Sequence, residues 1–217
     1  MGTFYGNVLV ARACEEAVPL LAGADVTGYA LPVGPGHTAI YPDAETSAPD
    51  LAGALSELLG APAVGTYVFD SDVLVMLVFE DGALRLHYDS CPGYFGEPET
   101  DENGDPPALA EDFEFPEPVG VDPDAFLRLA AAPVDRAALE SALRGTPLDP
   151  EDGEDGRYVF ANDQHYDVMA GLGLDAPRLC TGHRYLSWGD MPHETSADDL
   201  ILLGGARRPV PRDQGPF

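Results

Sequence analysis

The sequence predicts an α+β protein built around a largely antiparallel sheet. Short apolar segments with strand-like patterning alternate with amphipathic helical segments in the first part of the chain. Glycine-containing turns join several of these segments directly, as in hairpins. Hydrophobic residues make up 45% of the 217 residues, which is enough to build a core. No apolar run approaches the ~20 residues of a membrane-spanning helix.

The first four elements follow from apolar runs and from the residues that interrupt them. Residues 5–10 predict a strand, and residues 15–21 predict a helix in which Pro19 lies in the first turn or produces a kink. The apolar segments 29–33 and 38–41 flank a short glycine-proline turn, which predicts a hairpin.

A second helix and three strands complete this region. Ser47 precedes an apolar helical face and is followed three residues later by Asp50, so we expect it to cap a helix that Gly60 ends. Three strands follow, over residues 64–69, 73–79 and 84–88. The middle one is apolar on both faces and is therefore expected to be central. The order is a ferredoxin-like β-α-β-β-α-β core with a two-strand extension, and helices would cover one face of its sheet.

An acidic segment divides the chain. Residues 97–118 hold nine acidic residues, five prolines and no base, which predicts a linker or a long exposed loop. It separates the ferredoxin-like α+β domain, residues 1–96, from a smaller mainly helical region with short strands, residues 119–204. Residues 205–217 are expected to be a flexible tail.

The mainly helical region carries its own start signals. Asp122 and Asp135 are expected to cap two helices, and Asn162 a third. Short strands are expected over residues 158–160 and 184–188 because tyrosine, tryptophan and phenylalanine favour strands.

The charge of the chain narrows its partners. With 38 acidic residues against 11 basic ones, all of them arginine, the formal net charge is -27. This balance argues against a protein that binds nucleic acid or an anionic membrane, because phosphate contacts need lysine and arginine. It favours a basic protein partner, whose association an acidic surface accelerates. A saline environment or codon composition would also account for the acidity.

The first residues and the cysteines indicate the compartment. The N-terminal residues lack the basic segment of a secretory signal. Cys14, Cys91 and Cys180 are odd in number and widely spaced, unlike a disulfide framework. We therefore expect a cytoplasmic protein with reduced thiols. No cofactor is expected, and the oligomeric state stays open.

Two segments resemble a group of uncharacterised bacterial proteins. Residues 67–95 contain a strand, the acidic turn Asp70-Ser71-Asp72, a second strand, the turn Asp81-Gly82, and the Ser-x-Pro-x-Tyr-Phe ending Ser90-Cys91-Pro92-Gly93-Tyr94-Phe95. Residues 158–186 are similar to the C-terminal part of the same group. The resemblance covers about half of the chain and implies a shared fold but no particular reaction.

One strand carries residue types suited to nucleophilic catalysis. His87 and Asp89 precede Cys91, and these types can serve as base, orienting group and thiol nucleophile. Positions i and i+2 of a strand lie ~7 Å apart, too far for a direct hydrogen bond between short side chains. The simpler interpretation is a polar, solvated strand face. Arg85 shares that face and, with Arg184, is a candidate binding residue.

Zinc and calcium sites are weaker candidates. Cys180, His183 and His193 are zinc-type donors, but a structural zinc site needs four ligands in compact pairs, and a second pair is missing. A small buried cysteine beside a histidine is the simpler interpretation. Residues 101–105 resemble the start of a calcium loop, yet Pro106 stands where that loop needs glycine.

Two functions of different class remain. The favoured hypothesis is a non-catalytic acidic protein-interaction module, of the inhibitor or immunity type, for a basic partner. The alternative is an enzyme or small-ligand sensor with a site between the two regions around Arg85, His87 and Arg184. It predicts a concave pocket that contains at least two of these three side chains.

Overall fold

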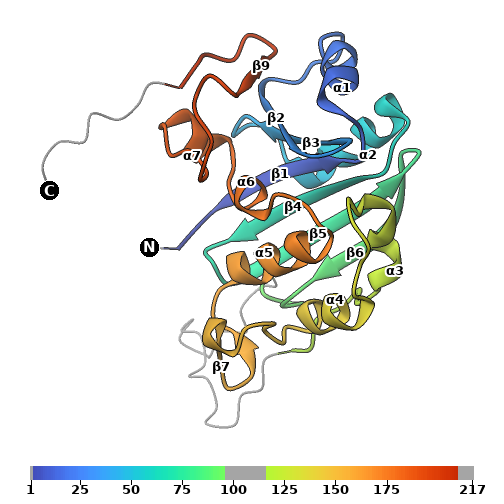
Figure 1. Cartoon of the computed structure of the whole chain (residues 1–217), viewed down its shortest axis with the longest axis vertical. Coiled ribbons are helices and arrows are strands. Elements are labelled where there is room, and N and C mark those ends of the chain that lie inside the picture. Colours follow the sequence, from blue (N-terminus) through green and yellow to red (C-terminus); the bar gives the residue numbers. More distant parts are fainter. Residues whose placement is uncertain (1, 96–115, 210–217) are drawn as a thin grey trace, which may run out of the picture.

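The computed structural model describes residues 2–95 and 116–209. Within them the protein is mixed α/β, and seven strands form one antiparallel sheet in the order β6-β5-β4-β1-β3-β2-β9 (Figure 1). The strands of this sheet are β1 (Tyr5–Val10), β2 (Gly28–Gly34), β3 (His37–Pro42), β4 (Ala63–Phe69), β5 (Val73–Glu80), β6 (Ala83–Asp89) and β9 (Ile201–Leu203). A separate hairpin consists of β7 (Gly153–Glu154) and β8 (Arg157–Tyr158).

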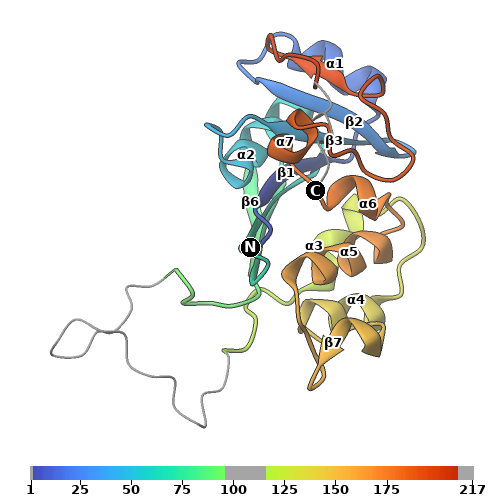
Figure 2. The same ribbon diagram turned by 90° about the vertical axis from the view of Figure 1, so that its left-hand side faces the viewer.

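Helices lie on both faces of the sheet. They are α1 (Cys14–Leu21), α2 (Ala48–Leu59), α3 (Pro123–Phe126), α4 (Arg136–Leu143), α5 (Ala161–Gly171), α6 (Ala176–Leu179) and α7 (His183–Ser187), with the 3-10 turns η1 (Leu127–Leu129) and η2 (Pro150–Asp152). Figure 2 shows α3, α4, α5 and α6 together on one side of the sheet and α2 on the other. The two helices of the first region, α1 and α2, cover one face as expected, and the apolar sides of the later helices pack on the second face.

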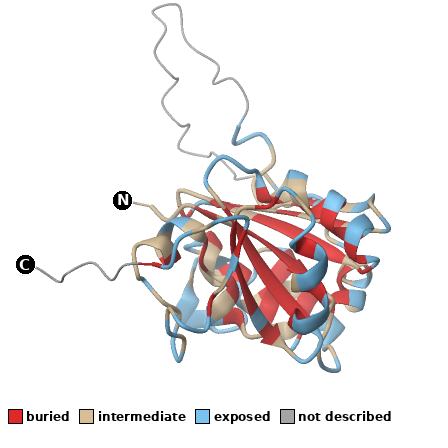
Figure 3. Ribbon diagram, turned by 90° about the horizontal axis from the view of Figure 1, so that it is seen from above, coloured by how far each residue is buried: buried red, intermediate tan, exposed pale blue. Residues whose placement is uncertain are grey.

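Two cores result, one on each face. The first joins the sheet to the later helices through buried side chains such as Leu74, Met76, Phe126 and Val168. The second packs α1 and α2 on the opposite face, around Ile40. Figure 3 shows the buried residues concentrated in the strands between these layers. The sheet and the mainly helical region therefore share one core.

The predicted turns and caps of the first region are confirmed. The Ser47 hydroxyl accepts a hydrogen bond from the Asp50 amide at 3.5 Å. Gly60 ends α2 with a left-handed φ of 57°. Asp81 and Gly82 have φ values of 49° and 76°, as a type I′ hairpin turn requires.

The sheet is larger than predicted. Besides the six strands expected from the first region, β9 pairs with β2, placing Leu202 opposite Tyr29. Strands β1 to β4 occupy the order β4-β1-β3-β2 within it.

Two predictions for the second region are wrong. Residues 184–188 were expected to form a strand but contain most of helix α7, because Leu186 becomes buried on a helical face that follows Gly182. Asn162 does not cap α5, since the helix already begins after Phe160. The predicted strand over residues 158–160 is only the short β8.

The caps predicted at Asp122 and Asp135 are confirmed. The Asp122 carboxylate accepts from the Asp124 amide at 3.0 Å. The Asp135 carboxylate accepts from the Ala137 amide at 3.0 Å and from the Ala138 amide at 3.2 Å.

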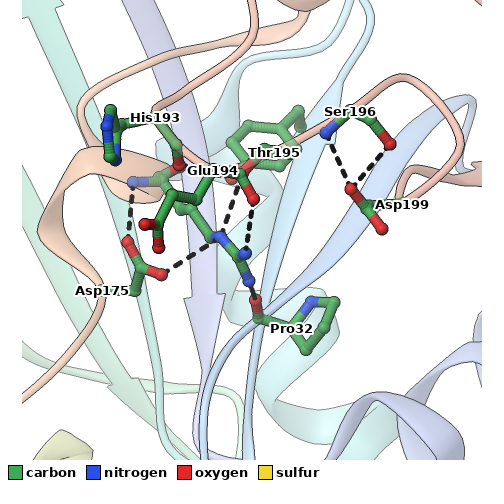
Figure 4. A network of polar contacts seen from close by, with 9 residues as sticks. Pro32, Asp175, His193, Glu194, Thr195, Ser196 and Asp199 are labelled. Carbon is green, nitrogen blue, oxygen red and sulfur yellow. Dashed lines mark hydrogen bonds and ion pairs between the residues drawn. The ribbon is translucent and has the colours of Figure 1, made fainter.

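Arg178 links the segment that leads into β9 to strand β2 through polar contacts. Its guanidinium forms an ion pair with Asp175 at 3.1 Å and donates to the Thr195 hydroxyl at 3.1 Å and to the Pro32 carbonyl at 3.0 Å. Figure 4 shows Asp175, Pro32 and Thr195 converging from three segments of the chain. The network ties the chain around Glu194 to the sheet and to α6.

Several predicted features lie wholly or partly outside the described residues. The calcium-like segment 101–105 and most of the predicted linker over residues 97–118 belong to this group, as does the end of the predicted tail. Among the helices that the structure describes, none has the length and apolar character needed to cross a bilayer.

Candidate functional site

Five aromatic side chains form a continuous cluster on the α2 side of the sheet. We call this cluster the aromatic face; its members are Phe4, Tyr67, Phe69, Tyr94 and Phe95. Phe69 lies at its centre, with its ring centroid 4.9 Å from Phe4, 5.8 Å from Tyr94 and 5.2 Å from Phe95. These rings meet edge to face, the arrangement that aromatic quadrupoles favour. Tyr94 and Phe95 are nevertheless 41% and 55% exposed.

Helix α2 does not extend over this face, and none of the other described helices covers it. A methyl group added at Gly65 would lie 2.6 Å from the Ala48 carbonyl oxygen, so the first turn of α2 rests directly on the sheet there. Tyr67 and Phe69 continue the same face of β4 beyond that turn, and both are only half-buried. Figure 2 shows no described helix beside this lower part of the sheet on the α2 side.

Half-buried aliphatic side chains extend the aromatic face across the neighbouring strand. Val75 lies opposite Tyr67 in the β4–β5 register, and Leu77 follows two residues later. Both are half-buried, whereas Leu74 and Met76 on the other face of β5 are fully buried. The result is an apolar surface bounded by described backbone but covered by none of the described helices.

Three carboxylates border the aromatic face. We call Asp70, Asp72 and Asp89 the acidic rim. Asp72 accepts a hydrogen bond from the Tyr94 hydroxyl at 3.2 Å, Asp70 directly follows β4, and Asp89 ends β6. None of the three forms an ion pair with an arginine of the described residues. The rim therefore carries uncompensated negative charge.

Two cavities lie near the aromatic face. The hairpin cavity, of about 590 Å³, lies between Cys91, Tyr94 and the β7–β8 hairpin. Its two arginines, Arg144 and Arg157, form ion pairs with glutamates at 2.7 and 2.9 Å. The β1–α7 cavity, of about 490 Å³, lies between the start of β1, the β3–α2 connection and the start of α7.

The candidate catalytic residues His87, Asp89 and Cys91 do not form a linked constellation. The Asp89 carboxylate accepts from the Cys91 amide at 2.9 Å and so supports a turn of the backbone. The His87 side chain is exposed. Burial, together with Asp89 and Asp72, raises the pKa of the Cys91 thiol, which keeps it protonated and weakly nucleophilic.

The candidate binding residues Arg85 and Arg184 lie in different places. Arg85 pairs with Glu80 at 3.6 Å, and Arg128 of the second region pairs with the same carboxylate at 3.2 Å. Arg184 lines the β1–α7 cavity, which joins the two regions of the chain. Neither Arg85 nor His87 lines that cavity or the hairpin cavity.

The candidate zinc ligands are also separated. The His183 ring stacks on Tyr29 with 4.9 Å between centroids, His193 lies in an exposed loop, and Cys180 lies beside His165. The part of the chain that the structure describes contains no group of three or more histidine, cysteine, aspartate or glutamate residues placed to hold a metal ion.

A buried polar network lies under the later helices. The Tyr5 hydroxyl is 2.8 Å from His165 Nδ1, and Cys180 Sγ is 3.7 Å from the same nitrogen. Burial lowers the pKa of His165 to about 3 and, as the largest cause, raises the pKa of Cys180 to about 12. Both groups are therefore neutral at pH 7, which does not suit a thiolate–imidazolium pair.

The aromatic face was not predicted as a site from the sequence. Tyr94 and Phe95 stood out only as the ending of a motif, and Phe4 carried no signal. The alternation of Tyr67 and Phe69 in a strand was a usable signal, because two rings at positions i and i+2 share one face. No protein-family model, curated protein or solved structure matches this chain.

Proposed function

We propose that the protein is a non-catalytic interaction module that binds a basic protein through the aromatic face and its acidic rim. The observation that carries the proposal is the exposure of Tyr94 and Phe95 at 41% and 55% on an apolar part of the sheet. Exposed aromatic residues grouped on one surface are typical anchors of protein interfaces. By covering the cationic surface of its partner, the module would act as an inhibitor or immunity-type protein.

The charge around the face supports a basic partner. The acidic rim has no described ion-pair partners, and the chain as a whole carries a net charge of -27. An acidic or neutral partner would place like charges, or unpaired carboxylates, in the interface. A second copy of this chain is disfavoured for the same reason. The fit is therefore to an apolar surface bordered by lysine or arginine.

The chemistry of the described titratable groups favours binding over catalysis. The Cys91 and Cys180 thiols have raised pKa values, and His165 is held neutral by burial, which lowers its pKa. We also propose that β1 to β4 with α1 and α2 form a ferredoxin-like core, on the support of their order β4-β1-β3-β2. Residues 119–204 then form a helical region packed onto that core.

The test is capture of a basic protein by the intact chain and by matched variants. The double variant Tyr94→Ser, Phe95→Ser removes the exposed rings. The control is Phe160→Ser, which removes a ring of similar exposure, 49%, outside the aromatic face. Captured proteins are identified by mass spectrometry at low and at high salt, and binding of the purified basic protein is measured by calorimetry.

The expected result is capture of a basic protein that the double variant loses and the Phe160→Ser variant retains. Binding should weaken as salt is raised, because screening reduces attraction between exposed charges. Equal capture by all three forms would overturn the proposal, as would salt-independent binding or a captured partner that is acidic.

A further inference from the structure

The β1–α7 cavity has the size and location of a small-molecule site. Its volume of about 490 Å³ lies within the ~300–1,000 Å³ typical of ligand pockets. The chain crosses directly over β1 at this point, since a methyl group added at Gly182 would lie 2.9 Å from the Tyr5 Cβ atom. Strands β1 and β3 pair only from Val8 to Val10, so the cavity forms beside the start of β1, which pairs with β4 but not with β3.

Arg184 differs from nearly all arginines of the described residues. Ten arginines lie in the described ranges, and eight of them form ion pairs with carboxylates; Arg184 and Arg207 do not. Arg184 lines the cavity, with its guanidinium carbon 4.6 Å from the centre of the Trp188 ring. Stacking on an aromatic ring holds the guanidinium plane while leaving its edge free to donate hydrogen bonds.

Arg184 is the positively charged side chain of the cavity, because the other ionisable groups that line it are neutral or acidic. Burial lowers the pKa of His183, and Asp43 offsets this shift only in part. The ring of His183, stacked on Tyr29, is therefore neutral at pH 7. Glu45 lines the cavity from the β3–α2 connection and is exposed. Its charge opposes that of Arg184 and must weaken the attraction for any anion.

The remaining walls are mostly apolar, with the polar residues Thr46 and Ser47 on the β3–α2 side. Phe4 and Tyr67 supply aromatic surface, and Pro42 and Ala48 supply aliphatic surface. A mostly apolar cavity with the single cation Arg184 suits a ligand that has one negatively charged group and one apolar part. Guanidinium groups favour carboxylate and phosphate because both accept two parallel hydrogen bonds.

We propose that the β1–α7 cavity binds a small organic anion, with a carboxylate or phosphate group on Arg184 and an apolar ring against Phe4 and Tyr67. Phe4 and Tyr67 belong both to this cavity and to the aromatic face, so the two proposed sites adjoin, but different variants test them. Tyr94 and Phe95, which test the partner-binding surface, do not line the cavity, and Arg184 does not belong to the aromatic face. Either proposal can therefore fail while the other stands.

The experiment is a titration of the full chain, followed by amide resonances in two-dimensional NMR. The probes are benzoate and phenyl phosphate, with benzylamine as a ligand of similar shape and opposite charge. Three variants are compared with the natural sequence: Arg184→Gln, Glu45→Gln and Arg207→Gln. Arg207 is the matched control, because it is exposed, forms no ion pair with a described residue and lies outside the cavity.

The two cavity variants should change affinity in opposite directions. We expect at least one of the two anions to shift the amides of Gly6 and Gly182. Arg184→Gln should weaken this binding at least tenfold, Glu45→Gln should tighten it, and Arg207→Gln should leave it within twofold. Absence of binding by both anions would overturn the proposal. So would unchanged affinity in Arg184→Gln, or equal binding of benzylamine.

Discussion

The two faces of strands β4 and β5 consist of alternating residues of the same segments, but their side chains differ in burial. On one face Val64, Val68 and Met76 are fully buried under the later helices. On the other, Tyr67 and Leu77 are half-buried. The period-2 geometry of a strand makes this division possible within a few residues. The region after residue 119 therefore covers one face of these two strands, whereas on the other face α2 covers the end around Ala63 and Gly65 and leaves Tyr67 and Leu77 half-buried.

The largest expected difference between the faces is in core stability. Met76→Ala should lower the free energy of unfolding by about 2–5 kcal/mol, because it leaves a cavity among fully buried neighbours. Leu77→Ala, on the open face, should cost about 1 kcal/mol, since its side chain already contacts solvent. Urea unfolding followed by circular dichroism measures both values. Equal losses would mean that the two faces are equally covered in solution.

The next effect concerns the buried network of the covered face. The pKa of His165 is lowered by burial to about 3, against about 6.5 in an unfolded chain. Below about pH 6.5, His165 therefore becomes protonated in the unfolded state but stays neutral in the folded state. Stability is lost as the pH falls from about 6.5 toward 3, with a slope of up to about 1.4 kcal/mol per pH unit from this group.

Unfolding at pH 7, 6 and 5 isolates this contribution when variants are compared. His165→Gln should show a shallower loss of stability than the natural sequence across this range. His87→Gln is the matched control, because it removes an exposed histidine on the opposite face of the sheet. The explanation fails if the two variants have the same slope.

A smaller effect is expected where the last strand joins the sheet. Arg178→Met removes hydrogen bonds to Thr195 and Pro32 and the ion pair with Asp175. The Arg178 side chain is 23% exposed, so we expect a loss of about 1–2 kcal/mol and faster amide exchange in β9. Arg208→Met, which removes an exposed ion pair with Asp198, should change stability by less than about 0.5 kcal/mol. If amide exchange in β9 is unchanged in both variants, β9 is held by strand pairing alone.

The sequence was informative wherever local chemistry decides the structure. Helix α2 begins after Ser47 and ends at Gly60, and Asp81-Gly82 forms the turn between β5 and β6. These features were predictable because helix caps and positive φ angles depend on the residues themselves. The prediction failed where tertiary packing decides. The segment after Gly182 has strand-forming aromatic residues but folds as α7, because burial of Leu186 outweighs a weak preference.

The candidate site was harder to predict than the fold. Arg184 was selected from sequence and lies in a cavity, but Arg85 and His87 lie outside it. Their separation follows from long-range pairing, which composition does not encode. The aromatic face gathers Phe4, Phe69 and Phe95 from three segments distant in the chain. Each of these residues alone carries no signal in the sequence, and they meet because the start of β1, the end of β4 and the segment after β6 lie close together in the fold.

The smallest expected effect separates the ring of Tyr94 from its hydroxyl. Tyr94→Phe removes the exposed 3.2 Å hydrogen bond to Asp72 but keeps the ring contacts with Phe69 and Phe95. Stability should change by less than about 0.5 kcal/mol, because an exposed hydrogen bond is replaced by one to water. Binding of the proposed basic partner should stay within about threefold, whereas Tyr94→Ser should weaken it more than tenfold. If both variants weaken binding equally, recognition depends on the hydroxyl and its carboxylate, and the open face of the sheet acts through polar contacts instead of apolar ones.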